Sequence, residues 1–166
     1  MKVLSLFSGI GGLDLAAEWA GMEVVAFCEI EPYPVEVLKR RWPDVPVFRD
    51  VFTLTRNTLA EQGIRPDDID CIIGGFPCQP FSVAGKRKGK KDERFLWGEF
   101  SRLIGEIRPS WVVAENVPGL ISIALDDILA DLESQGYGCL TFVYPASAVG
   151  APHRRERVFI VAHARC

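Results

Sequence analysis

The sequence lacks the features that would place it in several large classes of protein. No apolar run is long enough to cross a membrane, and glycines and Asp14 interrupt the N-terminal stretch where a signal peptide would need a continuous apolar segment. The five cysteines are odd in number and show no C-x-x-C spacing, which argues against a disulfide framework and a zinc site. We therefore expect a cytoplasmic protein that contacts no membrane and holds no metal.

An excess of one charge is also missing. Lys and Arg number 19, Asp and Glu number 22, and the net charge of −3 does not indicate nucleic acid as a partner. Fields from charged groups decay over about 8–10 Å at physiological salt, so local clusters matter more than the total. With 166 residues, 48% of them hydrophobic, the chain is long enough for one globular domain with a buried core.

Apolar runs alternate with amphipathic stretches almost from end to end. This alternation predicts an α/β fold, a doubly wound and mostly parallel sheet with helices on both faces. The last two expected strands have no helix between them, so we expect that pair to be antiparallel. The expected strands lie at 2–7, 23–28, 45–48, 70–75, 111–117, 139–144 and 157–162, and the expected turn-helix or helix segments at 9–20, 33–42, 55–62, 93–107 and 122–135.

The turn after the first expected strand reads FSGIGG, residues 7–12. In a doubly wound sheet, ligands bind beyond the carboxyl ends of the strands, commonly over this turn. Gly9, Gly11 and Gly12 permit a tight turn and let a ligand approach bare backbone at the start of a helix. The alternative is that these glycines serve only strand–helix packing. A P-loop is excluded, because G-K-[ST] does not occur.

Two acidic residues favour the ligand-binding interpretation. Glu29 ends the second expected strand, where an acid typically binds the hydroxyls of a ribose. Asp50 follows the third strand, where a carboxylate would accept a hydrogen bond from an adenine amino group, and Phe7 and Ile30 are placed to sandwich the adenine. Each acid alone could be a helix cap or a solvated residue. Together they predict a nucleoside-containing ligand, either a dinucleotide or S-adenosylmethionine.

The same edge of the sheet should carry reactive groups. Cys78 lies in GGFPCQPFS, directly after the fourth strand, which neighbours the first in a doubly wound order. AENV ends the fifth strand and brings Glu115 and Asn116 to this edge. Arg155 and Arg157 alternate before the last strand and, on an extended chain, would share one face. A third arginine of this segment, Arg154, adds to the positive charge.

These segments together resemble the cytosine-5 DNA methyltransferases. The segments LFSGIGGLDLA, CEIEPY, RDV, GGFPCQPFSVAGK, AENVPGL and GAPHRRERVFIVA are similar to the ordered motifs of that family over nearly the whole chain. The resemblance implies the methyltransferase variant of the doubly wound fold, S-adenosyl-L-methionine as cofactor and DNA as substrate, as in restriction–modification enzymes. It implies that Cys78 is the nucleophile, Glu115 the cytosine-binding acid, and Arg155 and Arg157 the arginines that hold the base.

The positions of these segments also predict the binding residues. The cofactor is expected to contact Phe7, Gly9, Gly11, Gly12, Glu29, Ile30, Asp50 and Pro77. The nucleic acid is expected to contact Gln79, Ser82, Asn116 and the basic residues Lys86, Arg87, Lys88, Lys90 and Lys91 of the segment 82–94. A solvated loop is the usual explanation for such a run of charges. Its position next to Cys78 favours contacts with phosphate groups instead.

The chemistry explains these residue types. Carbon 5 of cytosine is a poor nucleophile, and addition of a thiolate at carbon 6 makes it enamine-like, which divides one hard step into easier ones. A carboxyl group at ring nitrogen 3 is needed to accommodate the added electrons, and Glu115 fits that role. The base that removes the carbon 5 proton is not evident, and a water could supply it. Because the target base is stacked in a duplex, it must be flipped out at a cost of a few kcal/mol.

Three departures from the family pattern bear on function. Ser5 stands where many relatives have an acid, and His153 where a glutamine is common. Relatives also continue into a target-recognition domain and a closing motif, so we expect residues 1–166 to be a catalytic domain without those parts. Since Met1 almost begins the first strand, we expect one flank of the first strands to lack cover and the exposed apolar surface to favour a homo-oligomer or a second polypeptide.

Three alternatives stay open at this point. The chain could methylate cytosine in RNA, as one branch of the family does, or it could be a non-catalytic or split fragment that needs a partner chain. A cysteine hydrolase that pairs Cys78 with His153 or His163 is a more distant alternative, because it leaves the glycine turn, Glu29 and Asp50 unexplained.

Overall fold

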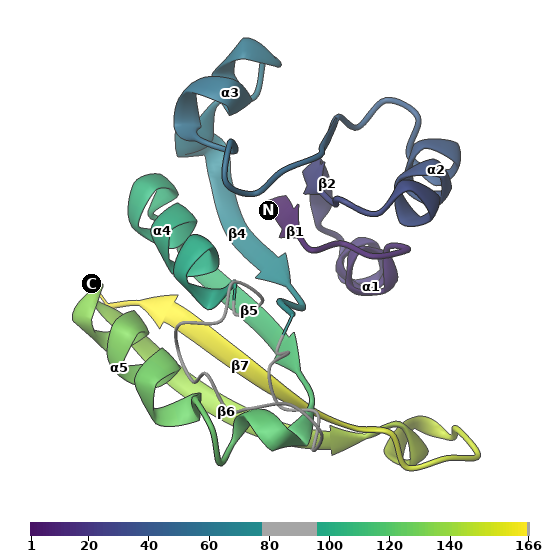
Figure 1. Ribbon diagram of the computed structural model, residues 1–166, viewed down its shortest axis with the longest axis vertical. Helices are drawn as coiled ribbons and strands as arrows, with labels where there is room; N and C mark the ends of the chain where they lie inside the picture. Colours follow the sequence, from purple (N-terminus) through teal and green to yellow (C-terminus); the bar gives the residue numbers. More distant parts are fainter. Residues whose placement is uncertain (78–95, 166) are drawn as a thin grey trace, which may run out of the picture.

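The computed structural model describes residues 1–77 and 96–165. A seven-stranded sheet in the order β3-β2-β1-β4-β5-β7-β6 forms its centre, with helices on both faces (Figure 1). The strands are β1 (Lys2–Leu6), β2 (Glu23–Cys28), β3 (Val47–Phe48), β4 (Ile69–Gly74), β5 (Trp111–Asn116), β6 (Tyr137–Pro145) and β7 (Glu156–Ala164). The helices are α1 (Gly12–Trp19), α2 (Pro32–Arg41), α3 (Arg56–Glu61), α4 (Trp97–Ile107) and α5 (Leu125–Ser134).

The strand directions confirm the predicted fold class. The strands from β3 to β5 pair in parallel, and β4 lies beside β1 as expected. The pair β6–β7 is antiparallel, as predicted from the missing helix between them. The chain reaches β6 first and then returns, so that β7 fits between β5 and β6 and is antiparallel to both. The carboxyl ends of the parallel strands therefore form one edge for a site.

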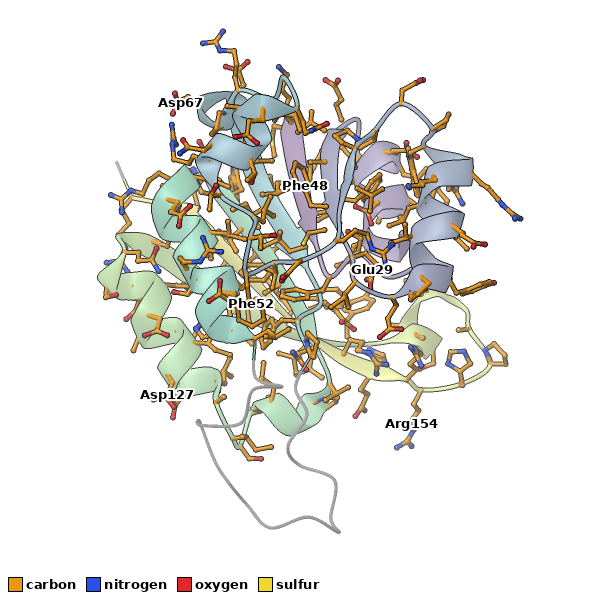
Figure 2. The ribbon with its side chains drawn as sticks, turned by 45° about the horizontal axis from the view of Figure 1, so that its top comes forward. Glu29, Phe48, Phe52, Asp67, Asp127 and Arg154 are labelled. Atoms are coloured by element: carbon orange, nitrogen blue, oxygen red, sulfur yellow. The ribbon has the colours of Figure 1, made fainter. Side chains whose placement is uncertain are left out.

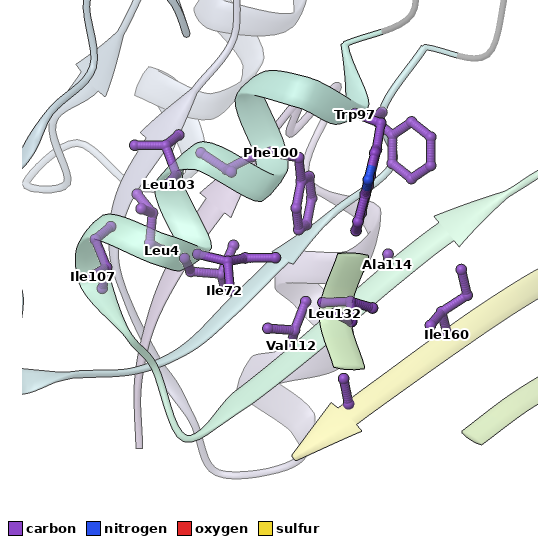
Figure 3. Close-up of a cluster of buried hydrophobic side chains, with 14 of the residues drawn as sticks. Leu4, Ile72, Trp97, Phe100, Leu103, Ile107, Val112, Ala114, Leu132 and Ile160 are labelled. Carbon is purple, nitrogen blue, oxygen red and sulfur yellow. The ribbon is translucent and has the colours of Figure 1, made fainter. Parts of the chain in front are cut away.

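One face of the sheet is covered by α3, α4 and α5. The apolar residues of α4 recur every three or four positions, which places Phe100, Leu103 and Ile107 on one side of the helix. These side chains are buried against strand residues such as Leu4 and Ile72 (Figure 3). Burying such side chains contributes about 1.5–3 kcal/mol each, so this packing fixes α4 firmly on the sheet.

The other face is covered by α1 and α2 over the first strands. Gly11 lies at the start of α1 with φ 87°, and a Cβ atom there would lie 2.5 Å from the ring of Trp42. Trp42 in turn packs on Phe27 of β2, with ring centroids 5.2 Å apart. The packing role that the sequence left open for the glycines is thus real for Gly11.

The expected gap in this cover lies elsewhere than predicted. The first strands are covered by α1 and α2, so the expectation that their flank is bare is wrong. A group of exposed apolar residues lies instead on the same face of the sheet over β5, β7 and β6, because alternate residues of paired strands share a face. Leu140, Phe142 and Tyr144 of β6 are 49–66% exposed. Within residues 1–77 and 96–165, no helix is long and apolar enough to span a membrane.

Candidate functional site

A cavity opens at the carboxyl ends of β1, β2 and β3. It has a volume of about 270 Å³, near the lower limit of small-molecule sites, and its walls are mainly apolar. Glu29 and Phe52, both labelled in Figure 2, lie in the segments that follow β2 and β3. The cavity is lined by Phe7, Cys28, Glu29, Ile30, Glu31, Arg49, Asp50, Val51, Phe52, Gly75, Pro77 and Leu96.

Glu29 holds two segments of the cavity together. Glu29 is buried, with 8% of the residue exposed. Its Oε2 accepts a hydrogen bond of 2.7 Å from the backbone N–H of Gly9. The other oxygen, Oε1, accepts a bond of 2.9 Å from the N–H of Glu31. An ionised carboxylate has about four acceptor positions, so two remain for the hydroxyls of a ribose. Glu29 therefore has a structural role in the glycine turn in addition to the predicted binding role.

Asp50 shapes the opposite wall. Its carboxylate accepts a hydrogen bond of 2.9 Å from the N–H of Phe52, which closes a local turn typical of aspartate. Arg49 donates a bond of 2.6 Å to the carbonyl of Ile30, which connects the end of β3 with the loop after β2. Two carboxylates at neighbouring strand ends, between apolar walls, suit a nucleoside with hydroxyl and amino groups. The donor set thus fits the adenosine part of the expected cofactor.

Phe7, at the start of the glycine turn, lines the cavity on the side of β1. Phe7 has φ 53° and Gly9 φ 55°, both in the left-handed region that non-glycine residues seldom adopt. Gly9 adopts this conformation without strain, whereas for Phe7 it costs about 1–3 kcal/mol, and such non-glycine positions cluster at functional sites. The ring of Phe7 stacks on Phe100 of α4 at 6.4 Å. Of the expected cofactor residues, Gly9, Gly11 and Gly12 shape the turn without lining the cavity.

A second polar site lies at the end of β5 and the start of β7. Arg157 Nε and Glu115 Oε1 form an ion pair of 2.7 Å, with about a quarter of each side chain exposed. Gly75, which directly follows β4, lies against this pair, since a Cβ atom at Gly75 would be 2.9 Å from Glu115 Oε2. Gly75 also lines the cavity. It is therefore the single residue that lies between the cavity and the carboxylate of Glu115.

Asn116 fixes the segment that leads to Cys78. It is 5% exposed, and its Nδ2 donates a hydrogen bond of 2.9 Å to the carbonyl of Phe76. Its Oδ1 accepts a bond of 2.9 Å from the N–H of Val117. Each polar atom of the side chain thus makes one bond inside the protein, and a second N–H of Nδ2 and a second acceptor position of Oδ1 remain. The contact of Asn116 with nucleic acid stays a prediction.

Arg155 differs from the sequence interpretation. The argument that Arg155 and Arg157 share one face assumed an extended chain, but β7 begins at Glu156 and Arg155 has φ 36°. The backbone leaves the extended conformation there, so strand alternation does not apply and only Arg157 contacts Glu115. Arg154 and Arg155 are exposed, and Figure 2 shows Arg154 on the outer part of the β6–β7 hairpin.

The remaining predicted residues fall in the part of the chain that the structure leaves undescribed. These are the expected nucleophile and the expected contacts with nucleic acid, namely Cys78, Gln79, Ser82, Lys86, Arg87, Lys88, Lys90 and Lys91. Pro77, the last described residue before them, lines the cavity. The chain thus enters the segment of the expected nucleophile from the wall of the cavity.

A buried carboxylate below the glycine turn was not singled out from the sequence. Asp14 of α1 is fully buried, and neither of its carboxylate oxygens has a hydrogen-bond partner. Burial raises the pKa of Asp14 from 3.8 to about 6, and the nearby Ser5 hydroxyl lowers it by less. Ser5 Oγ itself donates 2.9 Å to Ser8 Oγ, within the turn. The sequence did carry a signal for this buried acid. Asp14 lies three residues before Ala17, so both lie on the buried face of α1.

Two comparisons of sequence bear on the family. A family model described as C-5 cytosine-specific DNA methylase matches residues 1–165. The Type II methyltransferase M.AquIA of Picosynechococcus sp. is 37% identical, over 98% of this chain and 71% of its own length. The Type II methyltransferase M.NgoFVII of Neisseria gonorrhoeae is 39% identical, over 96% of this chain and 43% of its own length. The chain thus spans about half the length of most such relatives, M.AquIA excepted.

Solved structures agree in fold. A crystal structure described as a prophage-encoded DNA modification methyltransferase of E. coli superposes with a TM-score of 0.83 at 32% identity, covering 99% of this chain and 47% of that chain. The Dnmt2 methyltransferase of S. pombe superposes with a TM-score of 0.80 at 23% identity, covering 99% of this chain and 51% of that chain, and this likeness shows the fold alone.

Proposed function

The chain belongs to the C-5 cytosine-specific DNA methylase family, and from this we propose that it transfers a methyl group from S-adenosyl-L-methionine to carbon 5 of cytosine in DNA. One observation supports this function above the others. Gly75 lines the cavity that fits the cofactor and also lies against the carboxylate of Glu115, which would bind the base. A cofactor and a cytosine bound at these two places would be neighbours, as methyl transfer requires.

The cofactor side of the reaction rests on residues that are already in place. When bound, S-adenosylmethionine supplies an electrophilic methyl group on a sulfonium sulfur. Glu29 would bind the ribose hydroxyls through its free acceptor positions, and Asp50 would accept from the adenine amino group. Phe7 and Ile30 would contact the adenine ring from the cavity walls. Pro77 would end the cavity next to the position of the nucleophile.

The cytosine side uses Cys78 and Glu115. The thiolate of Cys78 would add to carbon 6, and the electron pair released from the carbon 5–carbon 6 double bond would shift toward ring nitrogen 3, which takes a proton from Glu115. Arg157 holds Glu115 Oε1, which leaves Oε2 for the base. Carbon 5 would then take the methyl group, whose bond to the sulfonium sulfur breaks so that S-adenosylhomocysteine leaves. A base removes the proton of carbon 5, the carbon 6–sulfur bond breaks and releases the thiolate, and ring nitrogen 3 returns its proton to Glu115.

Contacts with the DNA backbone form a separate part of this proposal. The basic segment 82–94 is proposed to bind phosphates beside the flipped base. Arg154 and Arg155, which are exposed on the β6–β7 hairpin, are proposed to add to these contacts. Such contacts would make binding fall steeply with salt. Gln79 and Ser82 are proposed to contact the target nucleotide, and Arg155 is proposed to hold the base through a rearrangement of its turn. Cytosine in RNA is the second possible substrate, and it forms one arm of the test.

A further polypeptide is proposed to cover the bare face over β5, β7 and β6. The relatives contain more sequence than the region that this chain matches. Trp111, Leu140 and Phe142 are exposed on this face, and a contiguous apolar patch commonly marks an interface. The covering segment would come from the same protein, from a second copy or from a partner chain. Analytical ultracentrifugation tests whether a second copy binds.

We also propose that the protein is cytoplasmic, and cell fractionation tests this location.

The covalent step gives the most direct test. Fluorine at carbon 5 cannot leave as a proton, so an oligonucleotide with 5-fluorocytosine should become attached to the wild-type chain when S-adenosylmethionine is present. The Cys78→Ser variant should form no such complex, whereas Cys139→Ser, which changes a partly exposed cysteine of β6, should behave as wild type. Parallel reactions with DNA and RNA, with and without a candidate partner chain, identify the substrate. Capture by the Cys78→Ser variant would refute the assignment.

A further inference from the structure

An arginine on α4 makes contacts that neither the fold nor the proposed chemistry explains. Arg102 lies in the middle of the helix with 29% of its side chain exposed. Its Nε pairs with Glu99 at 2.7 Å and its Nη1 with Glu106 at 2.6 Å, one turn before and one turn after it. The two carboxylates hold the plane of the guanidinium group in one orientation.

The remaining nitrogen of this group reaches a different part of the chain. Arg102 Nη2 donates hydrogen bonds to the carbonyl of Val51 at 2.9 Å and to the carbonyl of Leu54 at 3.0 Å. These carbonyls belong to the turn that follows Asp50, and Val51 and Phe52 of this turn line the cofactor cavity. Asp50 closes the inner side of the same turn through the N–H of Phe52. We call the turn 51–54 the adenine wall, because it follows Asp50, which is proposed to bind the adenine amino group. Arg102 therefore holds the outer side of the adenine wall.

The helix that carries Arg102 also supports the segment before the nucleophile. Trp97 of α4 packs on Phe76 with ring centroids 5.3 Å apart, and Phe100 contacts Phe76 at 6.0 Å and Phe7 at 6.4 Å. Figure 3 shows Trp97 and Phe100 on the side of α4 that faces the strands. One rigid helix thus contacts both the adenine wall and the entrance to the Cys78 segment.

We propose that Arg102 is a positioning residue for cofactor binding, which fixes the turn 51–54 on α4 and so sets the distance between the adenine wall and the Phe76–Pro77 segment. This inference rests on the proposed function, because the ligand is S-adenosylmethionine. Arg102 touches neither the cofactor nor the base, and it acts through the backbone of Val51 and Leu54. A lysine in its place keeps the charge, but a single ammonium group cannot satisfy two carboxylates and two carbonyls at these positions.

Arg56 provides a matched control. This arginine of α3 donates a hydrogen bond of 3.0 Å to the carbonyl of Glu106 and pairs with Asp67 at 2.6 Å. It too therefore binds both a backbone carbonyl and an acid. It does not line the cavity. Arg102→Lys thus removes bonds to two carbonyls and two carboxylates, and Arg56→Lys removes bonds to one of each. A purely structural role of both arginines predicts weaker cofactor binding in both variants.

The experiment measures the dissociation constant of S-adenosylmethionine by calorimetry, together with amide hydrogen exchange at residues 51–54. Arg102→Lys should raise the constant about tenfold, as expected for the loss of about one hydrogen bond to a charged group, and should accelerate exchange in this turn. Arg56→Lys should change the dissociation constant and the exchange rate by no more than about twofold. This should hold even if its melting temperature falls as far as that of Arg102→Lys. A change below threefold in Arg102→Lys, or equal weakening in Arg56→Lys, would overturn the role of Arg102.

Two further measurements keep the outcomes distinct. If Arg102→Lys does not fold, Glu99→Gln and Glu106→Gln replace it, since each releases one side of the guanidinium group while Arg102 stays. Each should then raise the dissociation constant about threefold, and unchanged values would contradict the proposal. Wild-type chain that binds no S-adenosylmethionine would refute the proposed function itself, and with it the role of Arg102.

Discussion

The cofactor end and the base end of this strand edge are constructed from different kinds of bonds. At the cofactor end, Glu29 and Asp50 accept hydrogen bonds from backbone N–H groups, and arginines donate to backbone carbonyls. At the base end, Asn116 also bonds to backbone groups, but Glu115, the carboxylate proposed to bind the base, is held by an ion pair with another long side chain, Arg157. Backbone bonds fix the shape of a cavity before the ligand arrives, whereas a side-chain pair adjusts more readily. This suits a cofactor of constant shape and a base that enters after flipping.

The difference predicts that variants at the two ends change different measured quantities. Variants at the cofactor end should change the affinity for S-adenosylmethionine, and variants at the base end should change the rate of methyl transfer. A variant that changes both equally would show that the two ends are not separate. The predictions below test this separation, beginning with the largest expected effect.

Glu115→Gln should have the largest effect. Glutamine keeps the size of the side chain but cannot give a proton to ring nitrogen 3, and loss of a general acid typically lowers a rate about 10²–10⁴-fold. The rate of methyl transfer from labelled cofactor should fall by this factor, while the dissociation constant of S-adenosylmethionine stays within about twofold. Glu133→Gln, an exposed residue of α5, is the control. A rate close to that of wild type would exclude Glu115 as the acid.

Glu29→Ala should have the largest effect at the cofactor end. It removes the acceptor for the ribose and also frees the N–H groups of Gly9 and Glu31. Bonds to a charged group contribute about 1.5–3 kcal/mol, so the dissociation constant of S-adenosylmethionine should rise about 10- to 150-fold in calorimetry. Glu36→Ala, on the exposed side of α2, should bind as wild type. Unchanged affinity in both Glu29→Ala and Asp50→Ala would mean that the ligand binds elsewhere.

Asp14→Asn tests how much the buried carboxylate below the glycine turn lowers the free energy of unfolding. Because burial raises the pKa of Asp14 from 3.8 to about 6, the folded state binds this proton more tightly than the unfolded state. Stability is therefore lost as pH rises from about 4 through 6, and the full cost above pH 6 is at most about 3 kcal/mol. The variant should be more stable than wild type at pH 8 and similar at pH 4.

Urea unfolding at both pH values measures this difference, with the exposed Asp44→Asn as control. A gain in stability that is equal at pH 4 and pH 8 would show that the effect comes from packing or from a new hydrogen bond to Ser5. It would not then come from the ionisation of Asp14.

The sequence predicted much of the fold and of the cofactor end, because both depend on local patterns. The run EVVAFC alone predicts β2 at its observed limits, and Glu29 follows at the strand end where an acid was expected. The position of β7 between β5 and β6 could not be predicted, because pairing depends on which edge is free once the other strands have met. Arg102 shows the same limit. Its partners Glu99 and Glu106 are readable from helical spacing, but its carbonyl partners lie 48 and 51 residues away.

Gly75→Ala should have the smallest effect and tests the point where the two ends meet. The new Cβ atom would lie 2.9 Å from Glu115 Oε2, closer than real Cβ contacts, so the end of the Glu115 side chain must move. Moving a side chain off its rotamer costs about 0.5–1.5 kcal/mol, which corresponds to a loss of about 2- to 12-fold in the rate of methyl transfer. Because the Cβ atom meets Glu115, the affinity for S-adenosylmethionine should change by less than the rate.

The neighbouring glycine gives the contrast that makes this prediction specific. A Cβ atom at Gly74 would collide with the backbone carbonyl of Leu6, which cannot move without disturbing the pairing of β1 with β4. Gly74→Ala should therefore lower the melting temperature, whereas Gly75→Ala should leave it nearly unchanged. If Gly75→Ala weakened cofactor binding as much as it slowed methyl transfer, the wall between cavity and carboxylate would act as one unit. The two ends would then be a single site, because a shift of Glu115 would be transmitted directly to the cofactor.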